Sequence, residues 1–147
     1  MTGVHGTGTM VYRSQNLREW RKPEVVFLTS AGMWATDGGW APEVHEYRGR
    51  YYLFTTLHNE AKPLPIPAPN QYGIPAQLTN YMRGTIIAVA DSPLGPFTPL
   101  DETRPAPPAN FMTLDGTFYV DPDGQPWIVY AHEWLQKLDG TIRSCRT

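Results

Sequence analysis

The chain has 147 residues, 41% hydrophobic and 12% aromatic, which is enough apolar material for one packed domain and excludes a disordered chain. Its 12 basic and 14 acidic residues give a net charge of −2, so no basic surface is expected for nucleic acid or for an anionic membrane. The single cysteine, Cys145, excludes an internal disulfide and a cysteine-based zinc site, and 15 prolines with 13 glycines favour short strands over long helices.

The N-terminal part predicts half of a β unit. It carries no basic patch followed by an apolar run, so we expect no signal peptide, and the sequence does not indicate a compartment. No apolar run approaches the roughly eighteen residues of a membrane-spanning helix, so we expect a soluble chain. A short strand over 8–14 and a polar stretch over 16–20 precede a second strand over 24–27.

The stretch from Trp34 to Phe54 has the most informative composition. It predicts a loop rich in aromatic and acidic residues, followed by a hairpin that bends at Arg48-Gly49. Such a loop offers stacking faces, hydrogen-bond acceptors and a titratable ring to a sugar or another small polar ligand. The alternative is that Trp40 and Pro42 cap a strand and pack on a neighbouring sheet. The candidate ligand-binding side chains here are Trp34, Asp37, Trp40, Glu43 and His45.

Two proline-rich segments interrupt the strands that follow. The segment Ala61–Thr79 contains five prolines and predicts an inserted loop without regular strand or helix. A strand over 84–92 comes next, and a second proline-rich connection covers 99–108. The four residues Asp121–Gly124 superficially resemble a calcium loop, but they lack the later glutamate and predict a hairpin turn.

Three elements recur in the same order along the chain. The strand and aromatic residue of 8–20 recur at 84–97, the hairpin of 44–54 recurs at 118–130, and the pattern of 83–89 recurs at 139–145. Repeated four-stranded antiparallel units of this size are typical of β-propeller blades. The alternative is a single β-sandwich with chance similarity between its strands. We therefore predict one incomplete all-β domain over 1–147, about two and a half blades, with a half blade at 8–27, a full blade at 40–97 and a partial blade at 115–147.

Three motifs then resemble those of one family. Trp40-Ala-Pro-Glu-Val-His-Glu-Tyr-Arg-Gly-Arg-Tyr-Tyr-Leu-Phe54 resembles the Trp-Ala-Pro-Asp/Glu strand and turn of glycoside hydrolase family 43. The segments 114–134 and 11–20 resemble the next-blade motif and the Ser-Xaa-Asp-Leu-Xaa-Xaa-Trp element of that family. The resemblance implies a partial five-bladed β-propeller from an enzyme that inverts configuration while cleaving arabinose- or xylose-containing carbohydrates. From the residues themselves we expect no cofactor and no metal site.

Inverting hydrolysis requires two carboxyl groups about 6.5–9.5 Å apart, a base that activates water and an acid that protonates the leaving oxygen. A third carboxylate can keep the acid protonated through like-charge repulsion. The resemblance assigns that third role to Asp115, whose alternative is a turn aspartate at a strand start, and makes Glu43 a pocket-side carboxylate. In the family the base lies upstream of the position of Gly8 and the acid lies one blade further on, so neither has a counterpart in this sequence.

The remaining candidates are weaker. Asp37, Glu43 and Glu133 could substitute as acid or base, although their motif positions suggest substrate contact or structure. His45 and His132 are candidate ring-positioning groups near a sugar, with metal ligation or a purely structural role as alternatives, and Trp134 is a candidate stacking residue.

Two expectations concern the whole chain. Glu43 and Asp115 occupy similar places in the repeat, 72 residues apart, so we expect them to face one cleft. An incomplete propeller exposes blade faces and strand edges, so we expect a homo-oligomer formed through those faces or by strand exchange. The alternative function is a non-catalytic carbohydrate-binding or structural half-propeller.

Overall fold

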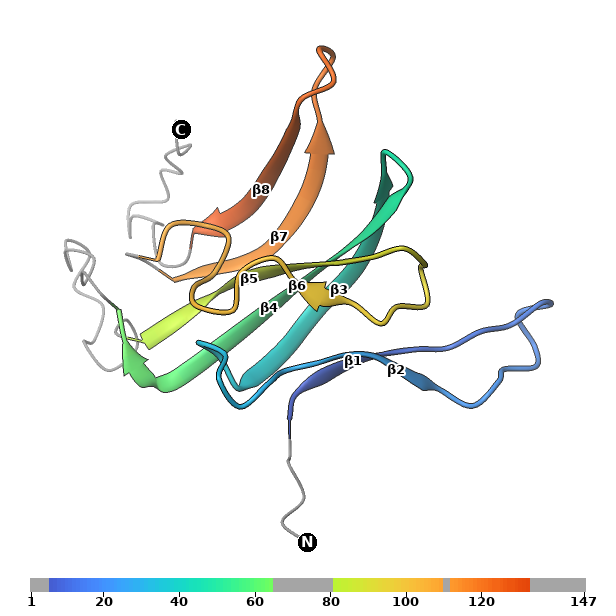
Figure 1. The fold of residues 1–147 in the computed structure, drawn as a ribbon, viewed down its shortest axis with the longest axis horizontal. Helices are drawn as coiled ribbons and strands as arrows, with labels where there is room; N and C mark the ends of the chain where they lie inside the picture. Colours follow the sequence, from blue (N-terminus) through green and yellow to red (C-terminus); the bar gives the residue numbers. More distant parts are fainter. Residues whose placement is uncertain (1–5, 65–80, 110–111, 133–147) are drawn as a thin grey trace, which may run out of the picture.

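The computed structural model describes residues 6–64, 81–109 and 112–132, and only the backbone of His132 (Figure 1). The described part of the chain contains strands and no helix, which confirms the all-β class. The strands form three antiparallel sheets in chain order. They are β1 (Gly8–Val11) with β2 (Glu24–Leu28); β3 (Asp37–Tyr47), β4 (Arg50–Pro63), β5 (Tyr81–Ala90) and β6 (Thr98–Pro99); and β7 (Thr113–Val120) with β8 (Pro126–His132).

The four-stranded sheet is a meander in which each strand pairs with the next strand in sequence. Its first hairpin turns at Arg48 and Gly49, whose φ angles are 52° and 78°. Positive φ at both central residues is the geometry whose twist matches a two-residue hairpin. The bend predicted from the sequence is therefore confirmed.

The two faces of this sheet pack against different neighbouring strands, because successive residues of a strand point to opposite sides. On one face, Leu53 and Leu57 of β4 are fully buried and join a core that includes Phe27 of β2 and Trp34. Alternate residues of β4 point to the other face, towards β7: Tyr52, Phe54, Thr56 and His58. Figure 1 shows the β1–β2 pair and the β7–β8 pair on opposite sides of the sheet.

Two sequence-based expectations about loops were wrong at their edges. Strand β4 continues through Pro63, which pairs with Tyr81, although the segment from Ala61 was expected to contain no strand. The ladder is irregular between Asn59 and Pro63, so the proline at position 63 interrupts no regular run of ladder hydrogen bonds. Residues 65–80 of the expected insertion lie outside the described residues.

The expected loop before the hairpin is also shorter than predicted, since β3 already begins at Asp37. Gly38 and Gly39 have φ angles of 107° and 79°, a conformation that glycine adopts without steric cost, and the register of β3 shifts between Gly38 and Trp40. A bulged strand therefore takes the place of a loop.

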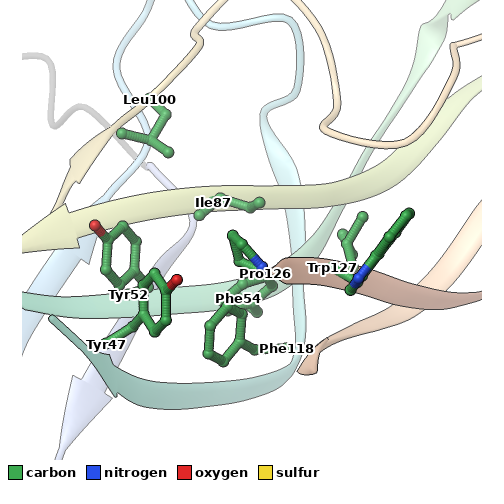
Figure 2. A pocket seen from close by; sticks show the side chains of 9 residues that line it. Tyr47, Tyr52, Phe54, Ile87, Leu100, Phe118, Pro126 and Trp127 are labelled. Atoms are coloured by element: carbon green, nitrogen blue, oxygen red, sulfur yellow. The ribbon is translucent and has the colours of Figure 1, made fainter. Parts of the chain in front are cut away.

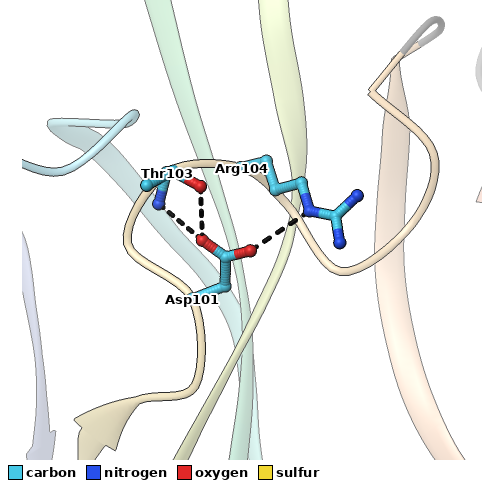
Figure 3. A network of polar contacts seen from close by, with 3 residues as sticks. All are labelled: Asp101, Thr103 and Arg104. Atoms are coloured by element: carbon cyan, nitrogen blue, oxygen red, sulfur yellow. Dashed lines mark hydrogen bonds and ion pairs between the residues drawn. The ribbon is translucent and has the colours of Figure 1, made fainter.

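The connection after β6 is fixed by a carboxylate (Figure 3). Oδ1 of Asp101 accepts hydrogen bonds from the backbone N–H and the hydroxyl of Thr103 at 2.7 and 2.6 Å, and Oδ2 accepts one from Nε of Arg104 at 3.1 Å. The bonds from Thr103, followed by the one from Arg104, lower the pKa of Asp101 to about 2. The proline-rich connection therefore has a defined conformation over 101–104.

The β7–β8 hairpin confirms the turn predicted at Asp121–Gly124. Oδ1 of Asp121 accepts hydrogen bonds from the backbone N–H groups of Asp123 and Gln125, and Gly124 has a φ of 79°. Oδ2 accepts a further bond from the indole N–H of Trp127 at 2.7 Å. The strand expected over 139–145 lies outside the described residues.

Nowhere in the described ranges does a helix have the length and apolar character needed to cross a bilayer.

Candidate functional site

Strands β3 and β7 contain the same bulge. In each strand the two flanking paired residues are three positions apart, whereas their partners on the neighbouring strand are two positions apart. One residue inside each bulge is a non-glycine with a positive φ, Ala41 at 44° and Asp115 at 49°. The paired residues that flank the bulge are Trp40 and Glu43 in β3, and Leu114 and Thr117 in β7. The register thus makes Thr117 the counterpart of Glu43, which corrects the expected equivalence of Glu43 with Asp115.

Two buried hydroxyl groups hold the β7 bulge against the middle sheet. The backbone N–H of Asp115 donates to Oγ1 of Thr56, and that of Gly116 donates to Oγ1 of Thr85, both at 2.9 Å. Thr56 and Thr85 pair across β4 and β5 and are 1% and 0% exposed. The backbone of Asp115 is thus anchored while the residue itself stays exposed. Aspartate tolerates the left-handed conformation better than most side chains, which suits this position.

Gly116 lets the strand approach this closely. A Cβ at this position would lie 2.4 Å from Oγ1 of Thr85 and 2.9 Å from Cδ1 of Ile128. Such a separation is shorter than any ordinary van der Waals contact, so a larger residue would push β7 away from β5. The Asp115-Gly116 dipeptide is thus fitted to the threonine pair.

Glu43 links β3 to β7 through its carboxylate. Its Oε1 lies 2.9 Å from Nε2 of His45, and the Thr117 side chain and the Phe118 backbone interact with the carboxylate so as to lower its pKa. Partial burial raises the pKa of Glu43, but the bond from Thr117, the contact with His45 and the bond from Phe118 together outweigh it. The pKa of Glu43 therefore lies below its ordinary value, and the group stays ionised near neutral pH. An ionised carboxylate suits a base or an electrostatic anchor better than a general acid.

The structure places the predicted tryptophans differently. Trp40 pairs with Thr56, the residue that accepts the Asp115 N–H, and it is 41% exposed. Trp34 is 1% exposed, belongs to the core, and offers no ring face to a ligand. Only Trp40 of these two presents an indole for stacking.

The other predicted side chains divide into three groups. Asp37 is exposed, accepts a hydrogen bond from the Thr36 hydroxyl at 2.9 Å, and lines a polar cavity of about 720 Å³ together with His58 and Glu60. The ring of His45 packs between Phe54 and Phe118, at centroid distances of 5.7 and 5.5 Å. Glu133, Trp134 and the side chain of His132 lie outside the described residues.

Glu43 and Asp115 both lie where β3 and β4 meet β7. Glu43 contacts Thr117, two residues beyond Asp115, and the Asp115 backbone is bonded to β4. Their convergence on one cleft stays a prediction.

Sequence reasoning missed three residues around Trp40: His58, Tyr81 and Arg83. The imidazole of His58 lies 4.8 Å from the indole, and Cζ of Arg83 lies 5.1 Å from it. The alternation of side chains along β4 could have indicated His58, because it puts this residue on the same face as Thr56. Tyr81 and Arg83 could not be found in this way, because the pairing of β4 with β5 spans the proline-rich segment and has no local sequence signature.

A second cavity, of about 330 Å³, lies between the middle sheet and the β7–β8 hairpin (Figure 2). Figure 2 shows Tyr52, Phe54, Phe118 and Trp127 around it. Its described lining contains no charged side chain. A sugar needs several oriented acceptors and donors, so we interpret this cavity as imperfect packing between sheets.

Comparisons with known proteins agree on one family. A family model described as glycosyl hydrolases family 43 matches residues 2–146. The chain is 30% identical over 105 residues to xylosidase/arabinosidase 43A of Humicola insolens, covering 71% of this chain and 25% of that protein. It is 39% identical to an endo-arabinase of Bacteroides thetaiotaomicron VPI-5482 of known crystal structure, with a TM-score of 0.67, covering 87% of this chain and 38% of that one. The chain thus spans well under half the length of both relatives, and the structural match confirms the partial propeller.

Proposed function

The chain belongs to glycosyl hydrolases family 43, and from this premise we propose that it acts in the inverting hydrolysis of O-glycosyl bonds in arabinose- or xylose-containing plant polysaccharides or oligosaccharides. The names of the two relatives, a xylosidase/arabinosidase and an endo-arabinase, support this substrate class. The observation that carries the proposal is the anchored β7 bulge, in which the backbone of the exposed Asp115 is bonded to Thr56, the residue that pairs with the exposed Trp40.

In this proposal Asp115 is the modulating carboxylate. Its backbone N–H is hydrogen-bonded to Thr56, which fixes the position of the backbone that carries the carboxylate, so that the charge can act on a nearby acid. A like charge close to that acid would raise the pKa of the acid and keep it protonated near neutral pH. Glu43 is the pocket-side carboxylate, and Asp37 supplies acceptors for sugar hydroxyls. His132, Glu133 and Trp134 remain predicted substrate contacts.

The acid and the base are not assigned to described residues. Glu43 is ionised and already engaged by Thr117 and His45, which argues against its use as the acid. We therefore propose that turnover depends on carboxylates contributed from beyond the described residues, including those of an associated chain.

Association would also cover the outer sheets. Large apolar side chains on β1–β2 and β7–β8 are at least half exposed: Met10, Val25, Leu28, Tyr119, Trp127 and Val129. Covering such surfaces contributes roughly 25 cal/mol per Å² of apolar area. We propose a homo-oligomer formed through these faces or by strand exchange. Light scattering coupled to size exclusion tests it, and a monodisperse monomer at micromolar concentration contradicts it.

Hydrolysis of aryl α-L-arabinofuranosides and aryl β-xylosides tests the main proposal. We expect activity on one of the two, and a loss of about 10²- to 10⁴-fold in Asp115→Asn because the acid would no longer be poised. Asp123→Asn in the exposed β7–β8 turn is the matched control and should retain full activity. Undiminished activity in Asp115→Asn would show that its assigned role is wrong.

One observation favours the alternative, a carbohydrate-binding module without turnover. The described residues present a stacking ring and carboxylates but no identified acid and base pair. Such a site binds a sugar without stabilising the transition state. Calorimetric binding of arabino- or xylo-oligosaccharides without product release, at high protein concentration, would establish this alternative.

A further inference from the structure

Three side chains gather around the exposed indole of Trp40 where β3, β4 and β5 run side by side. The imidazole of His58 lies 4.8 Å from the indole with an interplanar angle of 33°. Cζ of Arg83 lies 5.1 Å from the Trp40 ring and 4.8 Å from the Tyr81 ring, while His58 lies 6.0 Å from Tyr81. We call Trp40, His58, Tyr81 and Arg83 the indole cluster.

The sheet register explains why these residues meet. His58 and Arg83 are directly opposite each other on β4 and β5, so they lie on one face of the sheet. Each is two residues from a threonine that anchors the β7 bulge, His58 from Thr56 and Arg83 from Thr85, so the cluster shares a face with that bulge. The indole cluster and the Asp115 backbone are therefore parts of one surface.

Gly38 makes room for the imidazole. A Cβ at this position would lie 2.7 Å from the carbonyl oxygen of Thr56 and 3.2 Å from Cδ2 of His58. Its φ of 107° is also a conformation that side chains rarely adopt. The bulge at the start of β3 thus allows His58 to lie against Trp40.

These contacts restrict the rotation of a ring that would otherwise be mobile. An exposed indole on an edge strand loses conformational entropy when a ligand stacks on it. A ring whose rotation is already restricted loses less, so binding to it is less costly. Arg83 contributes a planar cation that stacks on aromatic faces. The polar cavity lined by Asp37, His58 and Glu60 adjoins the cluster and supplies acceptors for hydroxyl groups.

We propose that His58 and Arg83 are positioning residues that hold the indole of Trp40 as a preorganised stacking platform for a pentose ring. The inference rests on the proposed carbohydrate function and adds residues that carry the platform. Trp40 is 41% exposed, and the exposed part of the ring is the part offered to the sugar.

The test combines a spectroscopic and a binding measurement on the full chain. The indole N–H resonance of Trp40 is assigned by its loss in Trp40→Phe. Calorimetry measures the affinity for arabino- and xylo-oligosaccharides. The variants are Arg83→Gln, His58→Ala and the conservative His58→Phe. The matched control is Arg48→Gln, because Arg48 lies 5.0 Å over the ring of Tyr47 at the hairpin end, away from Trp40.

We expect Arg83→Gln and His58→Ala to shift or broaden the Trp40 resonance and to weaken oligosaccharide binding about three- to tenfold. His58→Phe keeps a flat ring and should restore affinity to within about twofold of the wild type. Arg48→Gln should change neither measurement. If Arg83→Gln does not fold, Arg83→Lys carries the same test, since lysine keeps the charge and loses the planar stacking surface.

Two results would overturn the inference alone: an unmoved Trp40 resonance, or unchanged affinity in both Arg83→Gln and His58→Ala while the wild type binds. If the wild-type chain neither binds nor cleaves any of these oligosaccharides, the proposed function is overturned, and the stacking platform with it.

Discussion

The two faces of the four-stranded sheet are built on different principles. The face towards β2 is mainly apolar, with Leu53, Leu57 and Ile86 essentially inaccessible. The face towards β7 changes along its length, from the apolar Phe54 through the hydroxyl of Thr56 to the imidazole of His58. Uniform burial fixes the first face, whereas the second depends on specific polar contacts with β7. Stability and function are therefore separable by mutating one face at a time.

The largest effect is expected on the apolar face. Leu57→Ala removes a fully buried side chain and leaves a cavity, which should lower the free energy of unfolding by about 2–5 kcal/mol. Urea denaturation measures this loss. Oligosaccharide affinity, measured where the variant remains folded, should stay at the wild-type level. A large drop in affinity of the folded variant would show that the two faces are coupled.

A smaller loss of stability is expected from overpacking the site face. Gly116→Ala places a Cβ 2.4 Å from Oγ1 of Thr85, and relieving that clash must move β7. Overpacking of this kind costs about 1–3 kcal/mol. Activity should fall with it, because the Asp115 backbone is adjacent. Gly32→Ala is the control, since a Cβ there meets nothing within 4 Å. Equal stability of the two variants would contradict the close fit of β7.

Two neighbouring threonines sharpen the comparison, because they face opposite sides of β4. Thr56 accepts the N–H of Asp115 at 2.9 Å, whereas Thr55 donates to the carbonyl of Trp40 at 3.1 Å. Each substitution by valine should cost about 1 kcal/mol in urea denaturation. Only Thr56→Val leaves the backbone N–H of Asp115 without its acceptor, so it should reduce hydrolysis or sugar binding more than Thr55→Val does. Equal functional losses in both variants would refute this distinction.

The same contrast explains what the sequence could predict. The turns at Arg48-Gly49 and Asp121–Gly124 were predictable because their chemistry is local. The bulge at Asp115 was not, because it depends on the fit of β7 to threonines from distant strands. Trp34 was expected at the site because aromatic and acidic residues surround it in the sequence, yet its ring lies in the core. A tryptophan in a sequence is equally consistent with burial and with ligand stacking, so the residue type alone could not decide.

The smallest expected effect concerns the pH dependence contributed by Glu43. Burial raises the pKa of this carboxyl, but the interactions with Thr117, His45 and Phe118 together lower it by more. The pKa therefore lies below its ordinary value of 4.5. A carboxyl with a depressed folded-state pKa stabilises the fold above its ordinary value, and this contribution disappears as the pH falls through the folded value.

Because the Glu43 side chain is 37% exposed, solvent screens the contribution and keeps it small. Glu43→Gln should therefore be slightly less stable than the wild type at pH 6–7, and the difference should shrink below about pH 4.5. Urea denaturation at several pH values measures this, with the exposed Glu46→Gln on the same strand as control. A difference that is independent of pH would mean that Glu43 joins β3 to β7 through its shape and hydrogen bonds rather than through its charge.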